Sequence, residues 1–162
     1  MRADVQVVVL GEGEARYAEA LRARAAATPG RIAVETTFSD HLEHVLLGGA
    51  DILLTPSQYE PCGLAQMRAQ RYGALPIAHR VGGLADTVED GVTGFLFDDD
   101  TAEGLSKAVA RALTLHADRE RWATMMRAAM LRDFGWRRSA RAYREVYRRA
   151  MNALHRRRDA QG

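Results

Sequence analysis

The chain has little of what disulfide cross-linking or membrane insertion requires. Its 162 residues include a single cysteine, which excludes an internal disulfide framework and fits a reducing cytoplasm. No apolar run approaches the length of a membrane span, and the first residues form neither a signal peptide nor a transit peptide. We therefore expect a cytoplasmic protein with no membrane partner.

The composition is that of a soluble globular protein. Hydrophobic residues make up 47% of the chain and charged residues 27%, and the length suits one domain with a sizeable core. Lysine occurs once against 22 arginines, which we interpret as a coding bias rather than as chemistry.

The net charge of +2 conceals two oppositely charged segments. Residues 1–110 hold 9 basic and 16 acidic side chains, a balance of −7, and residues 111–162 hold 14 and 5, a balance of +9. A basic segment can bind nucleic acid or an anionic surface. Here, however, the arginines interleave with apolar side chains at helical spacing, which indicates the solvated faces of amphipathic helices. The interleaved apolar side chains are Trp122, Met126, Met130, Tyr143, Val146, Tyr147 and Met151. We therefore expect no nucleic-acid partner.

Apolar runs and turn residues alternate along the chain in a way that predicts strands followed by helices. The fold class expected from this alternation is α/β, with a doubly wound parallel sheet of the Rossmann-like kind and ligands at the carboxyl ends of its strands. A domain over 1–135 and a terminal helix with a basic tail over 136–162 are predicted. The predicted strands are 4–10, 32–38, 52–54, 75–79 and 95–97, and the predicted helices are 15–27, 40–47, 62–72, 84–88, 102–115, 118–132 and 137–155.

One turn between a strand and a helix combines a carboxylate with a helix start. The apolar run Ile52–Leu54 predicts a strand that is covered on both faces and ends before Pro56. Pro61 suits the first position of a helix running from Cys62 to Tyr72, whose first amides would be unpaired and would favour phosphate. Glu60 would lie beside that anion site, where a carboxylate can meet sugar hydroxyls or a developing positive charge. The bland alternative is a solvated loop glutamate next to an ordinary helix start.

A second glycine-containing turn follows the next predicted strand. Arg80 stands at the end of that strand, and Gly82 and Gly83 allow close approach of backbone before the helix that follows. Three consecutive aspartates, 98–100, cannot all face one ion, so we interpret them as a solvated cap of the next helix rather than as a metal site.

Three motifs together resemble the bacterial glycogen synthases and plant starch synthases. They are Glu-Pro-Cys-Gly-Leu-x-Gln at 60–66, Tyr-Gly-x-x-Pro at 72–76 and Arg-x-Gly-Gly-Leu-x-Asp-Thr-Val at 80–88. The resemblance covers nearly the whole chain and implies a retaining glucosyltransferase of the two-domain GT-B fold, with ADP-glucose as donor and an α-1,4-glucan as acceptor. This chain would be the C-terminal, nucleotide-sugar-binding half without its first strand–helix unit. No cofactor and no metal are implied.

The resemblance also assigns roles to residues. The diphosphate would bind the amides of Gly63, Leu64 and Ala65, while Glu60 would grip the glucose together with Cys62. Phe38, at the end of a predicted strand, would flank the base, although a core phenylalanine is the alternative. Glu60 is the implied catalytic residue, and the implied substrate-binding residues are Phe38, Cys62, Gly63, Leu64, Ala65, Arg80, Gly82 and Gly83.

Some positions depart from the pattern of these synthases. Ala65 replaces a frequent Thr, which removes a side-chain donor to phosphate. Arg68 stands where a Tyr or a Glu is usual, and an arginine cannot accept a hydrogen bond from ribose hydroxyls. Val81 replaces a frequent Thr. The cations that such synthases place against the diphosphate, and their acceptor-binding N-terminal domain, would lie outside residues 1–162, so we expect the isolated chain to be inactive.

Two other functions are compatible with the same residues. One is a fragment of a different GT-B glycosyltransferase, of the sucrose or trehalose type, against which Cys62 and Gln66 argue. The other is a non-catalytic domain that binds a nucleotide sugar. No side chain reads a purine edge, so the choice between ADP and UDP is open. An unpaired sheet edge would also allow a homodimer.

Overall fold

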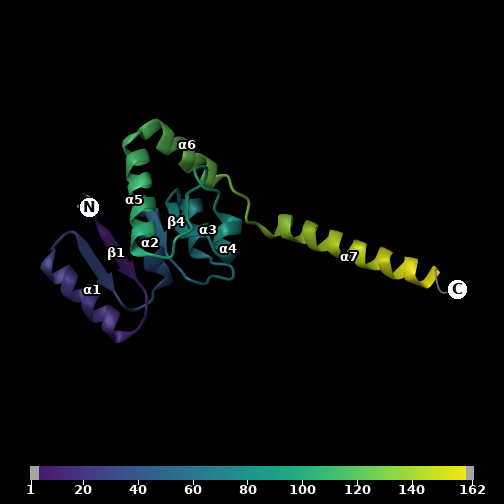
Figure 1. The fold of residues 1–162 in the computed structure, drawn as a ribbon, viewed down its shortest axis with the longest axis horizontal. Helices are drawn as coiled ribbons and strands as arrows, with labels where there is room; N and C mark the ends of the chain where they lie inside the picture. Colours follow the sequence, from purple (N-terminus) through teal and green to yellow (C-terminus); the bar gives the residue numbers. More distant parts are fainter. Residues whose placement is uncertain (1–3, 160–162) are drawn as a thin grey trace. The chain divides into compact units, whose positions relative to one another are not determined.

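The computed structural model describes residues 4–159 and divides the chain into two compact units, Met1–Ala50 and Asp51–Gly162. Each unit contains its own sheet, and all strand pairs in both sheets are parallel (Figure 1). In the described range, no helix has both the length and the apolar character that crossing a bilayer requires.

The first unit is a β-α-β-α segment. Strand β1 (Val7–Leu10) pairs with β2 (Ile32–Glu35), in a register that sets Val7 opposite Ile32. Helix α1 (Ala15–Ala27) connects them and has the bounds that the sequence predicts, and α2 (Asp40–Gly49) follows β2. Both strands are shorter than predicted.

Strand β2 ends at Glu35 because the Glu35 side chain bonds to the backbone two residues further on and turns the chain. The Glu35 Oε1 atom accepts a hydrogen bond from the Thr37 amide at 2.8 Å. Phe38 therefore lies in the loop before α2, and its side chain is 57% exposed. The prediction that Phe38 lies at the end of a strand is wrong, and so is the alternative that it is a core residue.

Helix α2 begins with a side-chain cap at Ser39, whose Oγ accepts a hydrogen bond from the Leu42 amide at 3.2 Å. We expect Ser39→Ala to lower the free energy of unfolding by about 1 kcal/mol, because the amide loses its partner. Chemical denaturation followed by circular dichroism measures this. Ser106→Ala is the control, since the Ser106 hydroxyl only donates to Ala102 O within a helix, and no loss is expected there. Equal losses in the two variants would contradict the capping role.

The second unit contains a three-stranded sheet in the order β3-β4-β5, with five helices. Its central strand is buried along its whole length. Strand β3 lies at one edge of this sheet, and its Leu54 is 42% exposed, so the prediction of a strand covered on both faces is wrong there. The elements are β3 (Ile52–Thr55), α3 (Ala65–Tyr72), β4 (Leu75–His79), α4 (Gly82–Thr87), β5 (Phe95–Phe97), α5 (Ala102–Ala117), α6 (Arg119–Met130) and α7 (Trp136–Asp159).

Alternation along β4 and β5 sends side chains to two separate hydrophobic clusters, as the period of two in a strand requires. On one face, the strands pack against α5 and α6, where Phe95 and Trp122 stack with their rings 6.4 Å apart. On the other face, Ala78 and Leu96 pack with Leu84 and Val88, from the region of α4. Helices thus cover both faces of this sheet (Figure 1), which is the doubly wound arrangement that the sequence predicts.

The caps of α5 and α6 differ from those that the sequence predicts. Aspartates 98–100 were expected to cap the first of these helices, and residue 118 was expected to lie inside the second. Thr101 Oγ1 accepts from the Gly104 amide at 3.1 Å, so Thr101 caps α5 and the three aspartates before it are exposed. Asp118 Oδ1 caps α6 in the same way. Within residues 4–159 no group of three or more His, Cys, Asp or Glu side chains is arranged to hold a metal ion.

Helix α7 has an apolar face that is open to solvent. Its apolar side chains recur at intervals of three and four residues, which places them on one face of the helix. Glu145 accepts hydrogen bonds from Arg148 and Arg149, and these bonds hold the pKa of the Glu145 carboxyl below its usual value. The exposed apolar residues are Trp136, Tyr143, Val146, Tyr147, Met151 and Leu154.

Candidate functional site

The turn between β3 and α3 has a different shape from the one that the sequence predicts. Strand β3 ends at Thr55, before Pro56, as predicted. Helix α3, however, begins at Ala65 instead of Cys62, because Gly63 adopts a left-handed conformation with φ of 71°. Pro61 is therefore not the first residue of the helix, and that prediction is wrong.

Glu60 lies in this turn, which we call the Glu60 turn. A hydrogen bond holds its backbone, whereas its side chain has no polar partner among the described residues. The side chain is half-buried, and among residues 4–159 its carboxylate forms no hydrogen bond or ion pair. The Glu60 carbonyl accepts from the Gly83 amide at 3.0 Å. The carboxylate can therefore accept hydrogen bonds from a ligand without first breaking a hydrogen bond or ion pair of the protein.

Unpaired backbone amides accompany this carboxylate. In the described part of the chain, the amides of Gly63, Leu64 and Ala65 have no acceptor. Leu64 is the N-cap of α3, so the last two of these amides belong to the helix start and lie at the positive end of its dipole. This arrangement can bind an anion.

The glycine pair before α4 packs directly on the Glu60 turn. A Cβ atom on Gly82 would overlap the Glu60 carbonyl oxygen, and one on Gly83 would overlap the Cys62 carbonyl oxygen. Gly82 is exposed and Gly83 is buried. The close approach that the sequence predicts is thus made to the protein's own backbone, and it brings the two sequence motifs into contact.

A buried amide side chain links the same two turns. Gln66 Nε2 lies 3.0 Å from the carbonyl oxygen of Cys62 and 2.9 Å from that of Gly63. It also donates to Thr87 Oγ1 at 3.0 Å, and the Thr87 hydroxyl in turn donates to Gly83 O at 2.6 Å. The hydroxyl of Thr87, which belongs to the third sequence motif, is therefore engaged within the protein. Sequence reasoning had Gln66 inside the motif but gave it no structural role.

Two polar residues end strand β4. The Arg80 Nε atom donates to Asp98 Oδ1 at 2.7 Å, and the pair is exposed. His79 is 8% exposed and stacks on Phe97, with its Nδ1 atom 2.9 Å from Ser57 O. Because a carbonyl can only accept, Nδ1 carries the proton. His79 thus anchors the start of the Glu60 turn, and the sequence offered only its position at a strand end as a signal.

The remaining predicted residues differ in their surroundings. Cys62 and Leu64 are exposed, and Ala65 is half-buried. Phe38 belongs to the first unit, whereas the other predicted site residues all belong to the second. The roles assigned to these residues from the sequence remain predictions.

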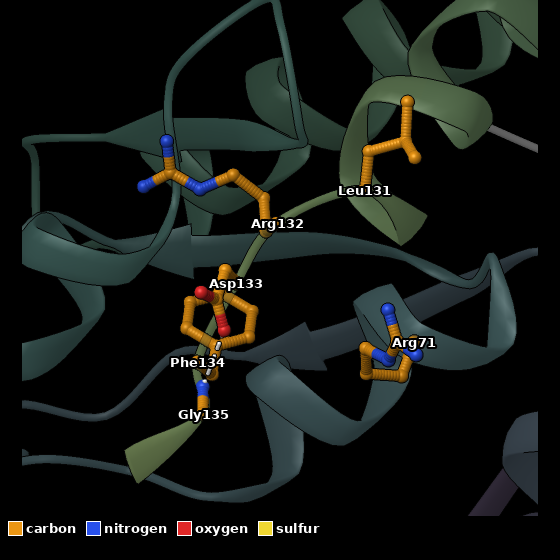
Figure 2. Close-up of a pocket in the computed structure, with 6 residues that line it drawn as sticks. All are labelled: Arg71, Leu131, Arg132, Asp133, Phe134 and Gly135. Atoms are coloured by element: carbon orange, nitrogen blue, oxygen red, sulfur yellow. Dashed lines mark hydrogen bonds between the residues drawn. The ribbon is translucent and has the colours of Figure 1, made fainter. Parts of the chain in front are cut away.

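The second unit also contains a pocket next to α3 that the sequence did not predict. It has a volume of about 480 Å³ and is lined by Arg71 and residues 131–135 (Figure 2). The Arg71 guanidinium donates to Met130 O at 2.6 Å, and Asp133 accepts from the Gly135 amide at 2.8 Å, the bond dashed in Figure 2. An adjoining hollow of about 280 Å³ shares Arg71 and extends along α3 to Leu64.

Comparison with known proteins identifies the family. Residues 1–128 match the family described as glycosyl transferases group 1. The chain belongs to this family. Among curated relatives, the glycogen synthase of Pseudomonas syringae pv. syringae is 46% identical over 143 residues, which are 88% of this chain and 30% of that protein. The chain thus spans about a third of the length of the curated relatives it matches.

Solved structures agree with the fold of a group 1 glycosyltransferase. The catalytic domain of starch synthase IV from Arabidopsis thaliana, bound to ADP and acarbose, superimposes with a TM-score of 0.81 at 30% identity, covering 91% of this chain and 32% of that one. Sucrose-phosphate synthase from Thermosynechococcus elongatus has a TM-score of 0.69 at 26% identity, with coverage of 91% and 39%. The predicted fold class is confirmed: an α/β fold with parallel strands, like the C-terminal half of a GT-B glycosyltransferase.

Proposed function

We propose that this chain is the donor-binding part of a glucosyltransferase of the glycogen or starch synthase type. Such an enzyme transfers glucose from ADP-glucose to the non-reducing end of an α-1,4-glucan with retention of configuration. The observation that carries the proposal is the contact between the Glu60 turn and the Gly82–Gly83 turn, beside unpaired amides at the start of α3. The names of the most similar relatives support the choice of reaction.

In this proposal, the residues of the two turns divide the donor between them. The amides of Gly63, Leu64 and Ala65 bind the diphosphate, and the Glu60 carboxylate accepts hydrogen bonds from glucose hydroxyls. The starch synthase IV structure bound to ADP supports a nucleotide as ligand. Cys62 contributes to the glucose contact, and the role of Phe38 beside the base stays a prediction from the sequence. Arg80, Gly82 and Gly83 complete the site on the side of β4.

The chemistry asked of these residues is mainly electrostatic. Loss of ADP from the sugar leaves negative charge on the diphosphate and positive charge on the sugar ring. The amides at the start of α3 stabilise the first, and the Glu60 carboxylate stabilises the second. We propose that the remaining length of such a synthase, which its relatives possess, binds the acceptor glucan and provides further cations.

Calorimetry and an elongation assay test this function. We expect ADP-glucose and ADP to bind the 162-residue chain, more tightly than UDP-glucose and UDP, without measurable elongation of an α-1,4-glucan. Tighter binding of the UDP ligands would redirect the assignment to another class of glycosyltransferase. Rapid elongation by the pure chain would contradict the division of labour proposed here, and a complete failure to bind nucleotide would contradict the donor-site assignment.

The exposed face of α7 has a place in the same proposal. The predicted terminal segment 136–162 would pack on the N-terminal domain of a complete synthase, and the solvent-exposed apolar stripe of α7 supports such a contact. A cytoplasmic location and a homodimer also remain predictions. Co-expression with the N-terminal domain of a related glycogen synthase, followed by size-exclusion chromatography, distinguishes a heterologous contact from self-association.

A further inference from the structure

The side chain of Gln66 is oriented by the groups around it. It is completely buried, and its Nε2 atom faces two carbonyl oxygens, those of Cys62 and Gly63. Exchanging the amide oxygen and nitrogen would set an acceptor against two acceptors, so the contacts fix the orientation. Gln66 therefore holds both carbonyl groups toward the interior of the turn.

Holding these carbonyls also directs two amides. In a planar trans peptide, the N–H of one residue points opposite to the C=O of the residue before it. The carbonyls of Cys62 and Gly63 are thus rigidly coupled to the amides of Gly63 and Leu64, which must point away from Gln66. These are two of the amides that have no acceptor in the described range.

The position of Gln66 is supported from α4. Thr87 accepts a hydrogen bond from Gln66 and donates its own to Gly83 O, which fixes the hydroxyl between the two turns. A Cβ atom on Gly63 would overlap the Gln66 amide. The left-handed glycine and the glutamine are therefore structurally coupled.

We propose that Gln66 is a positioning residue that orients the Gly63 and Leu64 amides toward the donor diphosphate, with Thr87 holding Gln66 in place. The inference rests on the proposed function, since it assumes that these amides meet a nucleotide sugar. Gln66 touches no ligand in this proposal and acts only through the backbone of the turn.

Gln70 provides a matched control for a purely structural role. It lies one turn further along α3, is equally buried, and donates to Gln66 O at 3.2 Å and Thr87 O at 3.1 Å. Within residues 4–159, the Oε1 atoms of both glutamines are buried without a partner. Gln70 does not hydrogen-bond to the carbonyls of residues 62 and 63. If buried amides only stabilise the fold, replacing either one should have the same effect.

The test compares Gln66→Met with Gln70→Met in the whole chain, using ADP-glucose calorimetry and ¹⁵N relaxation. We expect affinity to fall about tenfold in Gln66→Met and less than about twofold in Gln70→Met. Without ligand, order parameters of the Gly63 and Leu64 amides should fall from about 0.85 toward 0.6 only in Gln66→Met. Equal affinities, or equal order parameters, in the two variants would overturn the inference.

A second pair of variants covers the case in which Gln66→Met does not fold. Thr87→Val removes the hydroxyl that holds Gln66, and Thr87→Ser retains it. Weaker ADP-glucose binding in the first variant, with recovery in the second, supports the positioning role, and the same affinity in both overturns it. A wild-type chain that binds no nucleotide sugar sinks the proposed function and this inference with it. Binding that all these variants leave unchanged sinks this inference alone.

Discussion

Replacing Gly83 with alanine is expected to lower the free energy of unfolding by about 3 kcal/mol, because the added methyl group has no space. The new Cβ atom would overlap the Cys62 carbonyl and Cα atoms, which belong to backbone and cannot rotate away. The turn would have to move, and the hydrogen bond from the Gly83 amide to Glu60 O would be strained. Urea denaturation monitored by tryptophan fluorescence measures the loss, since Trp122 lies in the core of the same unit.

The control for this substitution lies on the same short helix. The side chain of Asp86 is exposed and forms no hydrogen bond or ion pair among residues 4–159, so Asp86→Ala should change the free energy of unfolding by less than about 0.5 kcal/mol. If Gly83→Ala proved as mild as Asp86→Ala, the tight contact between the two turns would be disproved. We also expect Gly83→Ala to weaken ADP-glucose binding, because the Glu60 turn is displaced.

Replacing Glu60 with alanine is expected to weaken ADP-glucose binding about 100-fold, while ADP binding changes little. The carboxylate is proposed to meet the hexose and not the nucleotide, so only the ligand that carries glucose should lose its hydrogen bonds. Stability should be nearly unchanged, because the carboxylate forms no hydrogen bond or ion pair in the described range. Titration calorimetry with the two ligands measures both affinities on the same preparation.

Glu103→Ala is the corresponding control for loss of a carboxylate. Glu103 pairs with Lys107 on the surface of α5 at 2.7 Å and lies outside both turns. Its removal should leave both affinities unchanged. A Glu60→Ala variant that lost ADP and ADP-glucose equally would move the carboxylate to the nucleotide part of the site, and one that lost neither would remove Glu60 from the site.

The sequence predicted correctly the strands that are bounded by residues typical of breaks in secondary structure. Strand β4 is bounded by Gly73-Ala74 and Arg80, and β5 follows Gly94 directly, so both were predicted with their observed bounds. Apolar runs of three to five residues between such breaks are typical of buried strands in a parallel sheet. Some helix ends were less predictable: residue 118 was predicted as the first residue of a helix, but Asp118 is the cap of α6, which begins at Arg119.

The start of α3 was predicted too early because contacts within the turn outweigh the preference of Pro61. Pro61 favours an earlier helix start by local preference, but the left-handed Gly63 and the buried Gln66 amide hold the chain out of the helix until Ala65. Strand β2 also ends at a side-chain contact, in which Glu35 accepts a hydrogen bond from the Thr37 amide two residues further on.

The site was predicted as a set of residues but not as a geometry. The resemblance to the synthases assigned Glu60 and the glycine pair to the same donor site, although 22 positions separate Glu60 from Gly82. The hydrogen bond from the Gly83 amide to Glu60 O joins segments that no local pattern relates. The link from Gln66 to Thr87 is equally non-local, and no local pattern indicated that these two polar side chains bond to each other.

The only thiol of the chain is exposed within the turn that carries the carboxylate. A maleimide dye or a spin label attached to Cys62 therefore reports from the candidate site and from no other place in the molecule. Because no second sulfhydryl competes for the reagent, the native sequence needs no cysteine removal before such labelling. Protection of this thiol by a bound molecule can be read directly from the rate of modification.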